Sequence, residues 1–471
     1  MTARAGVPGE TLTRGGSGER GDGPARVSVP GETRAGAISG EPTGPADEVP
    51  FPLSLWAEAV YSRRAIPAGL ATGAPVPGRP DVDPAPRAPG PRHLLAAPPL
   101  HLEPLRRTPA SLADPEVLAA LLHYSYGLLQ HDLTPGGWPH HRAVASARCR
   151  YPGELTLVTP TAAFRYDPMH HQLALLTPPM TDHQQLNPGD SRFVVITTNF
   201  APTAQLYGDY APRLCAQEAG MLLGAVHLVA AALGLRTRAG QDRETLLDLC
   251  AARPPTAEGE HAMGYLEILP SVERPAARSW PPPDLASVLR ARHSGAALFD
   301  PVPAPAPRAL LADLDVALAD APFSDFTCHL AVQRVIGSAP GHYLHDGIRL
   351  RRTSTGDPLP LLESIGQTEG RVSVNFRSTA CTAYIAVRRG AAVAAHGADA
   401  FRRLHLVAGA VAHLLCVVAA RHGLSARVHN GYDATSAERL LGPAADEETV
   451  LFQVAIGAAR PTAAFRLPVL F

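Results

Sequence analysis

The sequence predicts an α+β fold made of two similar domains in tandem. Between Pro-rich linkers, segments with the helical spacing of apolar residues alternate with short strand-like runs. Residues 219–238 align with residues 408–427 without a gap, and 8 of the 20 positions are identical. Further blocks match in the same order, which favours a duplication over chance similarity between two Ala-rich helices. At 471 residues the chain is long enough for two such domains.

Residues 1–92 are expected to form a disordered tail and a Pro/Gly-rich linker. Residues 1–100 contain 32 Gly or Pro, and the first 50 contain no aromatic residue. Such a segment buries too little apolar surface to offset the entropy lost on ordering. One apolar stretch, residues 51–61, is predicted to be a short helix that docks on the body of the protein.

Residues 93–272 are predicted to form the first domain. Residues 115–127 should be a helix, because Asp114 is a suitable N-cap and the apolar residues that follow share one face. A longer, nearly all-apolar helix is predicted over residues 215–235, ended by Gly234. Short strands are predicted at residues 155–158, 193–197 and 265–269.

A Pro-rich linker, residues 273–308, should lead to a second domain, residues 309–471. Three shorter blocks support the repeat: residues 164–167 resemble 343–346, residues 192–197 resemble 371–376, and residues 264–270 resemble 451–457. The apolar run 404–420 contains two histidines and stops at Arg421, so it is predicted to be a buried helix and not a membrane span.

Charge and composition exclude several functions. The formal net charge is -1, so no overall basic field exists to hold nucleic acid or an anionic membrane. The sequence contains no lysine, and all 42 basic residues are arginine. Schiff-base enzymes need a lysine amine and the P-loop needs a lysine for its phosphates, so both classes are excluded. An anion site must be built from arginine and backbone N–H groups.

The six cysteines lie far apart without a C-x-x-C pair, and the N-terminus has no apolar signal-peptide core. Both features favour a cytoplasmic protein. Histidines cluster at 140–141, 170–171 and 342–345 without a cysteine or carboxylate at ligand spacing, so no metal site is predicted and turn or surface positions are expected.

Residues 141–155 read HRAVASARCRYPGEL, and residues 164–167 read FRYD. These segments resemble the RAVPSAGALYPLEL and YxYD blocks of the SagB-type dehydrogenases, a branch of the nitroreductase-like flavoproteins. TAQLYG at 203–208 stands where that family has its WKYG block, and QEAG at 217–220 matches its EAG helix. The resemblance covers about residues 100–272 and, in outline, 325–460.

The resemblance implies FMN as the cofactor, held at the interface of a dimer. A tandem chain is then similar to a pseudo-dimer. LRRT at 105–108 sits where nitroreductases bind the phosphate, and guanidinium forks suit that group. Arg148 replaces a family glycine, which works against close approach of the backbone to the flavin. The residues expected to bind the cofactor are Arg106, Thr108, Arg142, Ser146, Arg148 and Arg236. Arg107, Arg150 and Arg238, taken singly, are expected to be solvated surface residues.

Tyr207 is the expected catalytic residue. In the family a Lys-Tyr pair acts in proton removal while hydride passes to the flavin, but Leu206 occupies the lysine position here. A tyrosine is a poor base at neutral pH unless a cation, such as Arg148 or Arg213, lowers its pKa. An aromatic packed at a strand end is an equally good interpretation of Tyr207, and Glu218 could have only a helix-dipole role.

The second copy lacks a counterpart of residues 142–151, and Val407 replaces Glu218. We expect it to have lost its catalytic set and to complete the interface. The resemblance therefore implies an FMN-dependent dehydrogenase that oxidises thiazoline or oxazoline rings in a ribosomally made precursor peptide. The alternative is a degenerate, non-catalytic flavin-fold partner that binds the precursor peptide or a cyclodehydratase. Pairing of two chains as a homodimer stays open.

Overall fold

The structure is a computed structural model, and the chain divides into two units, Met1–Asp47 and Glu48–Phe471. The described residues all belong to the second unit: Trp56, Val60, 91–105, 110–133, 139–176, 188–251, 260–269, 280–295, 298–368, 371–372, 374–440, 442, 447–461 and 466–469. The expected tail at 1–92 thus lies almost wholly outside the described residues, as do Arg106 and Thr108.

The first half is built on a seven-stranded sheet in the order β1-β6-β5-β4-β7-β9-β8. Its strands, all paired antiparallel, are β1 (Arg92–Leu94), β4 (Gly153–Val158), β5 (Ala163–Asp167), β6 (Gln172–Leu175), β7 (Phe193–Asn199), β8 (Arg236–Gly240) and β9 (Glu260–Leu269). Its helices are α2 (Pro115–Tyr126), α3 (Ala201–Tyr207), α4 (Ala211–Ala232) and α5 (Arg243–Ala251).

The second half is built on a six-stranded antiparallel sheet in the order β12-β11-β10-β15-β17-β16. Its strands are β10 (Thr327–Val332), β11 (Gly341–His345), β12 (Leu350–Thr355), β15 (Thr379–Val387), β16 (Ser425–His429) and β17 (Thr449–Gly457). Its helices are α7 (Ala309–Ala319), α8 (Leu359–Gly366), α9 (Arg389–His396), α10 (Ala400–Arg421) and α11 (Ala434–Glu438), and a small pair of strands, β13 (Gln367–Thr368) and β14 (Arg371–Val372), follows α8.

The predicted α+β class is confirmed, and the two sheets have the same strand order apart from β1. Helix α4 and helix α10 are both 22 residues long and lie 189 positions apart, as in the ungapped sequence match. The predicted helix at 115–127 is found as α2, and the Asp114 side chain accepts a hydrogen bond from the Glu116 amide as an N-cap. The strands predicted at 155–158, 193–197 and 265–269 lie within β4, β7 and β9.

One block of the predicted repeat is wrong. In the shared strand order, the counterpart of β7 is β15 and not residues 371–376. The reason is that α8, β13 and β14 intervene between β12 and β15, which shifts the equivalent strand along the chain. The predicted match of residues 164–167 with 343–346 agrees with the structure. Asp167 and Asp346 each accept hydrogen bonds from two backbone N–H groups in the turn after the strand.

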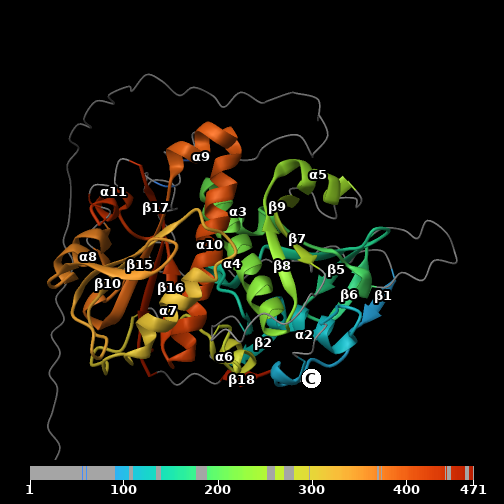
Figure 1. Cartoon of the computed structure of the whole chain (residues 1–471), viewed down its shortest axis with the longest axis horizontal. Coiled ribbons are helices and arrows are strands. Elements are labelled where there is room, and N and C mark those ends of the chain that lie inside the picture. The colour runs from blue at the N-terminus through green and yellow to red at the C-terminus, as the bar shows by residue number, and fades with distance from the viewer. Residues whose placement is uncertain are drawn as a thin grey trace, which may run out of the picture. The chain divides into compact units, whose positions relative to one another are not determined.

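Helices α4 and α10 lie side by side between the two sheets (Figure 1) and bring the halves into contact. They approach closely because glycines face each other at the crossing. A Cβ on Gly220 would lie 2.1 Å from the Leu406 carbonyl oxygen, and one on Gly409 would lie 2.0 Å from the Gln217 carbonyl oxygen. Only a residue without a side chain fits at these two positions.

Two buried arginines at equivalent positions of these helices cross between the halves. Arg213 Nη2 donates to the Leu451 carbonyl of β17 over 2.7 Å, and Arg402 Nη2 donates to the Gln241 carbonyl after β8 over 2.6 Å. Near the C-terminus, β18 (Arg466–Pro468) pairs with β2 (Leu128–Asp132) of the first half, which in turn pairs with β3 (His140–Arg142). One continuous cluster of buried apolar side chains runs through both halves.

The span predicted to be a linker, 273–308, contains helix α6 (Leu285–Ala291). Its apolar side chains are buried, so the high Pro content around it concealed a short packed helix. Of the helix predicted at 51–61 the structure describes only two residues, Trp56 and Val60, both buried; the Trp56 ring lies 5.1 Å from that of Phe401.

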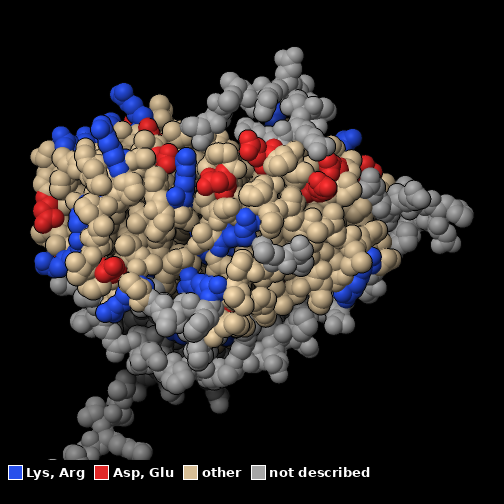
Figure 2. All heavy atoms as spheres, turned by 90° about the horizontal axis from the view of Figure 1, so that it is seen from below, with Lys and Arg blue, Asp and Glu red and all other residues tan. Residues whose placement is uncertain are grey.

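Two helical stretches, Ala201–Ala232 and Arg389–Arg421, are long and apolar enough to cross a membrane. Most of their residues are buried inside the structure, as in the core helices of globular proteins. On the face drawn in Figure 2, basic and acidic side chains are interspersed among uncharged ones. Among the described residues, no three His, Cys, Asp or Glu side chains are grouped so that they could hold a metal ion.

Candidate functional site

The candidate site lies at one end of the first sheet, where the motif loop and helix α3 meet. Gly153 at the start of β4 pairs with Thr198 near the end of β7, and Asn199 pairs with Glu260 at the start of β9. The loop of residues 143–152, which carries the family-like motif, leads directly into β4. Helix α3 follows β7 at the same end. The topology therefore brings the motif loop and Tyr207 to the same sheet edge.

The motif loop has an unusual backbone. Arg148, Cys149 and Tyr151 adopt the left-handed conformation, with φ of 54°, 54° and 48°. This conformation costs a residue with a side chain about 1 to 2 kcal/mol, and such strain gathers at functional sites. The Ser146 hydroxyl stabilises the loop by accepting a hydrogen bond from the Tyr151 amide over 2.8 Å. Arg148 thus keeps the backbone form that the family glycine would favour.

The Arg142 guanidinium packs against two aromatic rings, those of Tyr126 in α2 and Tyr151 in the motif loop. Its guanidinium carbon is 4.2 Å from the centre of the Tyr126 ring and 4.6 Å from that of Tyr151. Cation–π contacts of this kind hold a guanidinium without using its N–H donors. Among the described residues, Nε and Nη1 of Arg142 are buried and have no hydrogen-bond partner.

A second arginine, Arg292, reaches the same place from the residue after α6. It is 5% exposed and donates from Nη2 to the Arg142 carbonyl over 3.3 Å. Its Nε and Nη1 are also buried without a partner in the described part of the chain. Buried donors that lack acceptors cost free energy. Two such guanidiniums together form a donor set suited to an anion.

Glu218 is the buried carboxyl beside Arg142. Burial raises its pKa to about 8, although a hydrogen bond from Ser146 and the charge of Arg142 both act to lower it. Glu218 therefore keeps its proton at neutral pH. Its Oε1 has no hydrogen-bond partner among the described residues. One interpretation of the sequence gave Glu218 only a helix-dipole role. Glu218 is the eighth residue of α4, so it lies beyond the first turn, where the helix dipole acts.

The stability of the protein should depend on this proton. Because the pKa of Glu218 rises from 4.5 to about 8 on folding, only the folded state binds the proton between about pH 5 and 8, and the free energy of unfolding should fall as pH rises through this window. Glu218→Gln cannot lose a proton, so its urea midpoint should fall less than that of the wild type between pH 5.5 and 8.5. Parallel profiles for the two proteins would show that Glu218 titrates normally.

Tyr207 is the last residue of α3, not at a strand end as one interpretation had it. Arg148 lies within hydrogen-bonding reach of its hydroxyl. Burial nevertheless raises the pKa of Tyr207, and it outweighs the opposing charges of Arg148 and Arg150. Of the two cations considered from the sequence, Arg148 faces Tyr207, while Arg213 donates to Leu451 in the second half. Tyr207 is therefore a neutral phenol at pH 7.

The structure thus gathers Arg142, Ser146, Arg148 and Tyr207 at one end of the sheet. Arg236 is not among them: it is exposed and pairs with Leu269, at the opposite end of β8 and β9. Arg238 is also exposed, as expected, and forms an ion pair with Glu267. The same expectation is wrong for Arg150, which the packed motif loop buries. Arg106 and Thr108 lie outside the described residues.

Several residues at the site were not predicted from the sequence. Tyr151 lies inside the motif block and could have been singled out there, but Tyr126 and Arg292 come from distant segments without a motif. The loop also places Cys149 Sγ 4.0 Å from Nδ1 of His141, whose Nε2 lies 3.7 Å from Asp132 Oδ2.

The equivalent positions of the second half carry different chemistry. With α4 and α10 aligned at their 189-residue spacing, Glu218 corresponds to Val407 and Tyr207 to His396. Arg213 corresponds to Arg402, so the arginines that join the halves are present in both while the carboxyl and phenol of the site are present in one.

Neither a protein-family model nor a curated protein matches the chain. Among solved structures, one described as a nitroreductase from Anabaena variabilis matches with a TM-score of 0.58 and 19% identity, over 85% of this chain and 98% of that chain. Another nitroreductase structure, from Ralstonia eutropha, covers 42% of this chain and 98% of its own at 20% identity, with a TM-score of 0.26.

The microcin synthetase complex of E. coli, solved with a truncated pro-microcin bound, matches over 34% of this chain and 66% of that chain at 12% identity, with a TM-score of 0.27. The Anabaena match extends over both halves of the chain. It establishes that this chain has a nitroreductase-like α+β fold.

Proposed function

We propose that the protein is an FMN-dependent dehydrogenase that oxidises thiazoline or oxazoline rings to thiazole or oxazole in a ribosomally made peptide. One observation carries the proposal: two buried guanidiniums with unpartnered donors, Arg142 and Arg292, lie beside the left-handed motif loop. This is the place where the sequence resemblance puts the cofactor. The nitroreductase-like fold supports an oxidoreductase of the flavin type.

The donor set suits FMN. The phosphate carries a charge near -2 and is recognised by guanidinium forks. Arg142 and Arg292 would supply such forks, while the backbone amides of residues 146–148 would face the ring system, since those of residues 149–151 donate within the loop. Arg106 and Thr108 stay proposed phosphate contacts, and Arg236 would contribute only if the cofactor extended toward the far end of the sheet. When bound, FMN would accept two electrons as a hydride from the substrate ring, and molecular oxygen would reoxidise it.

The residues of the chain would handle the proton. The phenolate of Tyr207 would take a proton from the substrate ring. Arg148 would orient this phenolate and partly stabilise its charge. Because burial raises the pKa of Tyr207, the phenolate is scarce at neutral pH and turnover should rise in alkaline solution. Glu218, protonated at neutral pH, would leave the charge of Arg142 uncompensated for an anion.

The second half would complete the site as a dimer partner does. The shared strand order, the close crossing of α4 and α10, and the reciprocal Arg213 and Arg402 contacts support this pseudo-dimer. The precursor peptide is the proposed substrate, with a cyclodehydratase as a further partner, in the cytoplasm. Pairing of whole chains as a homodimer is not required by this arrangement.

One observation favours the second candidate function, a non-catalytic partner that binds the precursor peptide or a cyclodehydratase. Leu206 stands in the place of the family lysine, and the pKa of Tyr207 is raised, so neither half of the family pair is a ready base at neutral pH. Such a protein would bind peptide but would not oxidise it.

Cofactor binding tests the proposal. A charge-assisted hydrogen bond contributes about 1.5 to 3 kcal/mol, so Arg142→Ala should weaken FMN about ten- to a hundredfold in a fluorescence titration. Arg238→Ala is the matched control, because Arg238 is exposed and pairs with Glu267; its FMN affinity should match the wild type. Equal FMN affinity in Arg142→Ala and the wild type would remove Arg142 from the cofactor site.

A further inference from the structure

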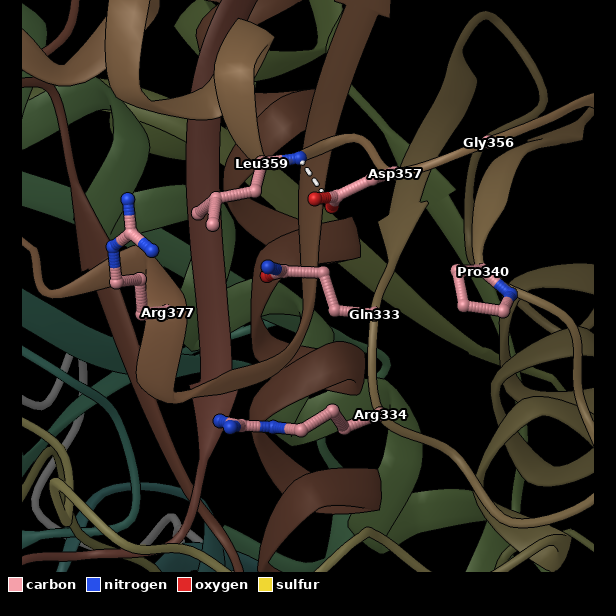
Figure 3. Close-up of a pocket in the computed structure, with 7 residues that line it drawn as sticks. All are labelled: Gln333, Arg334, Pro340, Gly356, Asp357, Leu359 and Arg377. Carbon is pink, nitrogen blue, oxygen red and sulfur yellow. Dashed lines mark hydrogen bonds between the residues drawn. The ribbon is translucent and has the colours of Figure 1, made fainter.

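A pocket of about 520 Å³ opens in the second half, at the end of its sheet where β10 stops and β15 begins (Figure 3). The corresponding end of the first sheet is the one opposite the motif loop. The pocket is lined by Gln333, Arg334, Pro340, Gly356, Asp357, Leu359 and Arg377. Leu359 is the first residue of helix α8, which lies between β12 and β15 in the chain.

Backbone hydrogen bonding turns two neighbouring side chains into the pocket. The amides of Gln333 and Arg334 both donate to the Ala380 carbonyl, over 3.0 and 3.1 Å. Two consecutive residues opposite one partner form a bulge, which re-aims side chains at the end of a strand. In Figure 3 both side chains extend in the same direction, toward the side where Arg377 lies. The Thr379 hydroxyl donates to Oε1 of the Gln333 side chain over 2.7 Å and holds it in place.

The charged groups around the pocket are unequally satisfied. Asp357 caps α8 by accepting the Leu359 amide over 3.0 Å, as the dashed line in Figure 3 marks. Arg377 Nε forms an ion pair with Glu363 Oε1 of α8 over 3.0 Å. Arg334 has no acidic partner within the described part of the chain; its Nη2 donates only to the Thr379 carbonyl, at 3.5 Å.

Among the described residues, the remaining donors of Arg334 have no protein acceptor. Burial lowers the pKa of the Arg334 guanidinium, as expected for a cation without a compensating anion. Leu359 and Pro340 add apolar atoms to the lining of the pocket. Pockets with apolar walls and a few converging polar groups are typical of small-molecule sites.

We propose that this pocket binds a small organic anion, with a carboxylate or phosphate on Arg334 and an apolar body against Leu359 and Pro340. The site is independent of the proposed cofactor site, because it is built from the second half alone. Arg377 lends a second, weaker cation at the rim, since Glu363 already engages it.

The test is calorimetric titration of the full chain, saturated with FMN, using benzoate, phenyl phosphate and the neutral benzamide. We expect one of the two anions to bind at least tenfold more tightly than benzamide, and the tighter anion identifies the group. Arg334→Gln should weaken that anion at least tenfold, and Arg334→Lys, which keeps the charge but loses the fork, should weaken it less. Arg351→Gln is the matched control, because Arg351 is exposed, pairs with Asp346 and lies outside the pocket.

Three results would overturn the proposal: benzamide binding as well as both anions, Arg334→Gln binding like the wild type, or Arg351→Gln losing as much affinity as Arg334→Gln. Circular dichroism shows whether Arg334→Gln folds. If it does not fold, Arg334→Lys and Arg377→Gln replace it, and wild-type anion affinity in both of these variants overturns the proposal. Repeating the titration on Arg142→Ala separates this site from the proposed function. Anion binding should persist there even if FMN binding is lost or never occurs.

Discussion

Gly220→Val is expected to unfold the full chain or leave it only marginally stable. The new Cβ would lie 2.1 Å from the Leu406 carbonyl oxygen and 2.9 Å from Gly409 Cα, and both are helix backbone atoms that cannot rotate away. Overpacking a core costs typically 1–3 kcal/mol, and a forced separation of two long helices should exceed about 3 kcal/mol, a large part of the 5–15 kcal/mol that stabilises most proteins. Urea unfolding followed by circular dichroism measures the loss.

Gly390→Val is the matched control for this substitution. Gly390 lies in α9, and a Cβ there would meet no atom within 4 Å. Its urea midpoint should stay close to that of the wild type. Gly409→Val should behave like Gly220→Val, because its Cβ would lie 2.0 Å from the Gln217 carbonyl oxygen. Wild-type stability in both crossing variants would mean that the two helices do not pack as described.

Tyr207→Phe should lower azoline turnover by about 10² to 10⁴, the usual contribution of a general acid or base. The ring packing is kept and only the hydroxyl is lost, so FMN affinity should not change. Turnover by the wild type should rise about tenfold per pH unit below the pKa of Tyr207, because that pKa is raised above 10 and the phenolate is the active base. The variant should lack this rise. Peptide oxidation followed by mass spectrometry from pH 7 to 9.5 measures both effects.

Tyr343→Phe serves as the control, because its hydroxyl donates to the Ala339 carbonyl in the second half, away from the motif loop. Its turnover should equal that of the wild type at every pH. If Tyr207→Phe retained full turnover, the hydroxyl would be structural and proton removal would have to occur elsewhere. A wild type that oxidises no azoline peptide but binds one would favour the non-catalytic partner.

The long elements could be predicted from the sequence because their signals are strong and local. Helices α4 and α10 have long apolar runs, and α2 has both an N-cap and a periodic face. The match of residues 192–197 with 371–376 failed because six-residue strand patterns are ambiguous and α8 shifts the true counterpart. Helix α6 was missed because its seven residues stand within a Pro-rich span.

The candidate site was predicted as far as it lies within one motif. Ser146 and Arg148 are four to six residues from Arg142, so a motif places them together. Arg292 lies 150 residues further along the chain and reaches Arg142 only through the packing of α6, which no local pattern indicates. The raised pKa values of Glu218 and Tyr207 depend on burial from all sides, and burial is set by the assembled fold.

The central claim is that one FMN binds beside Arg142 and the motif loop of the first half and is enclosed by the second half. The visible absorbance spectrum of the full chain, mixed with excess FMN and separated from free flavin by gel filtration, tests it most directly. The account predicts a yellow protein that retains one FMN per chain. Protein that elutes without colour after mixing with FMN would contradict the claim. Two FMN per chain would show that the second half has kept a site of its own.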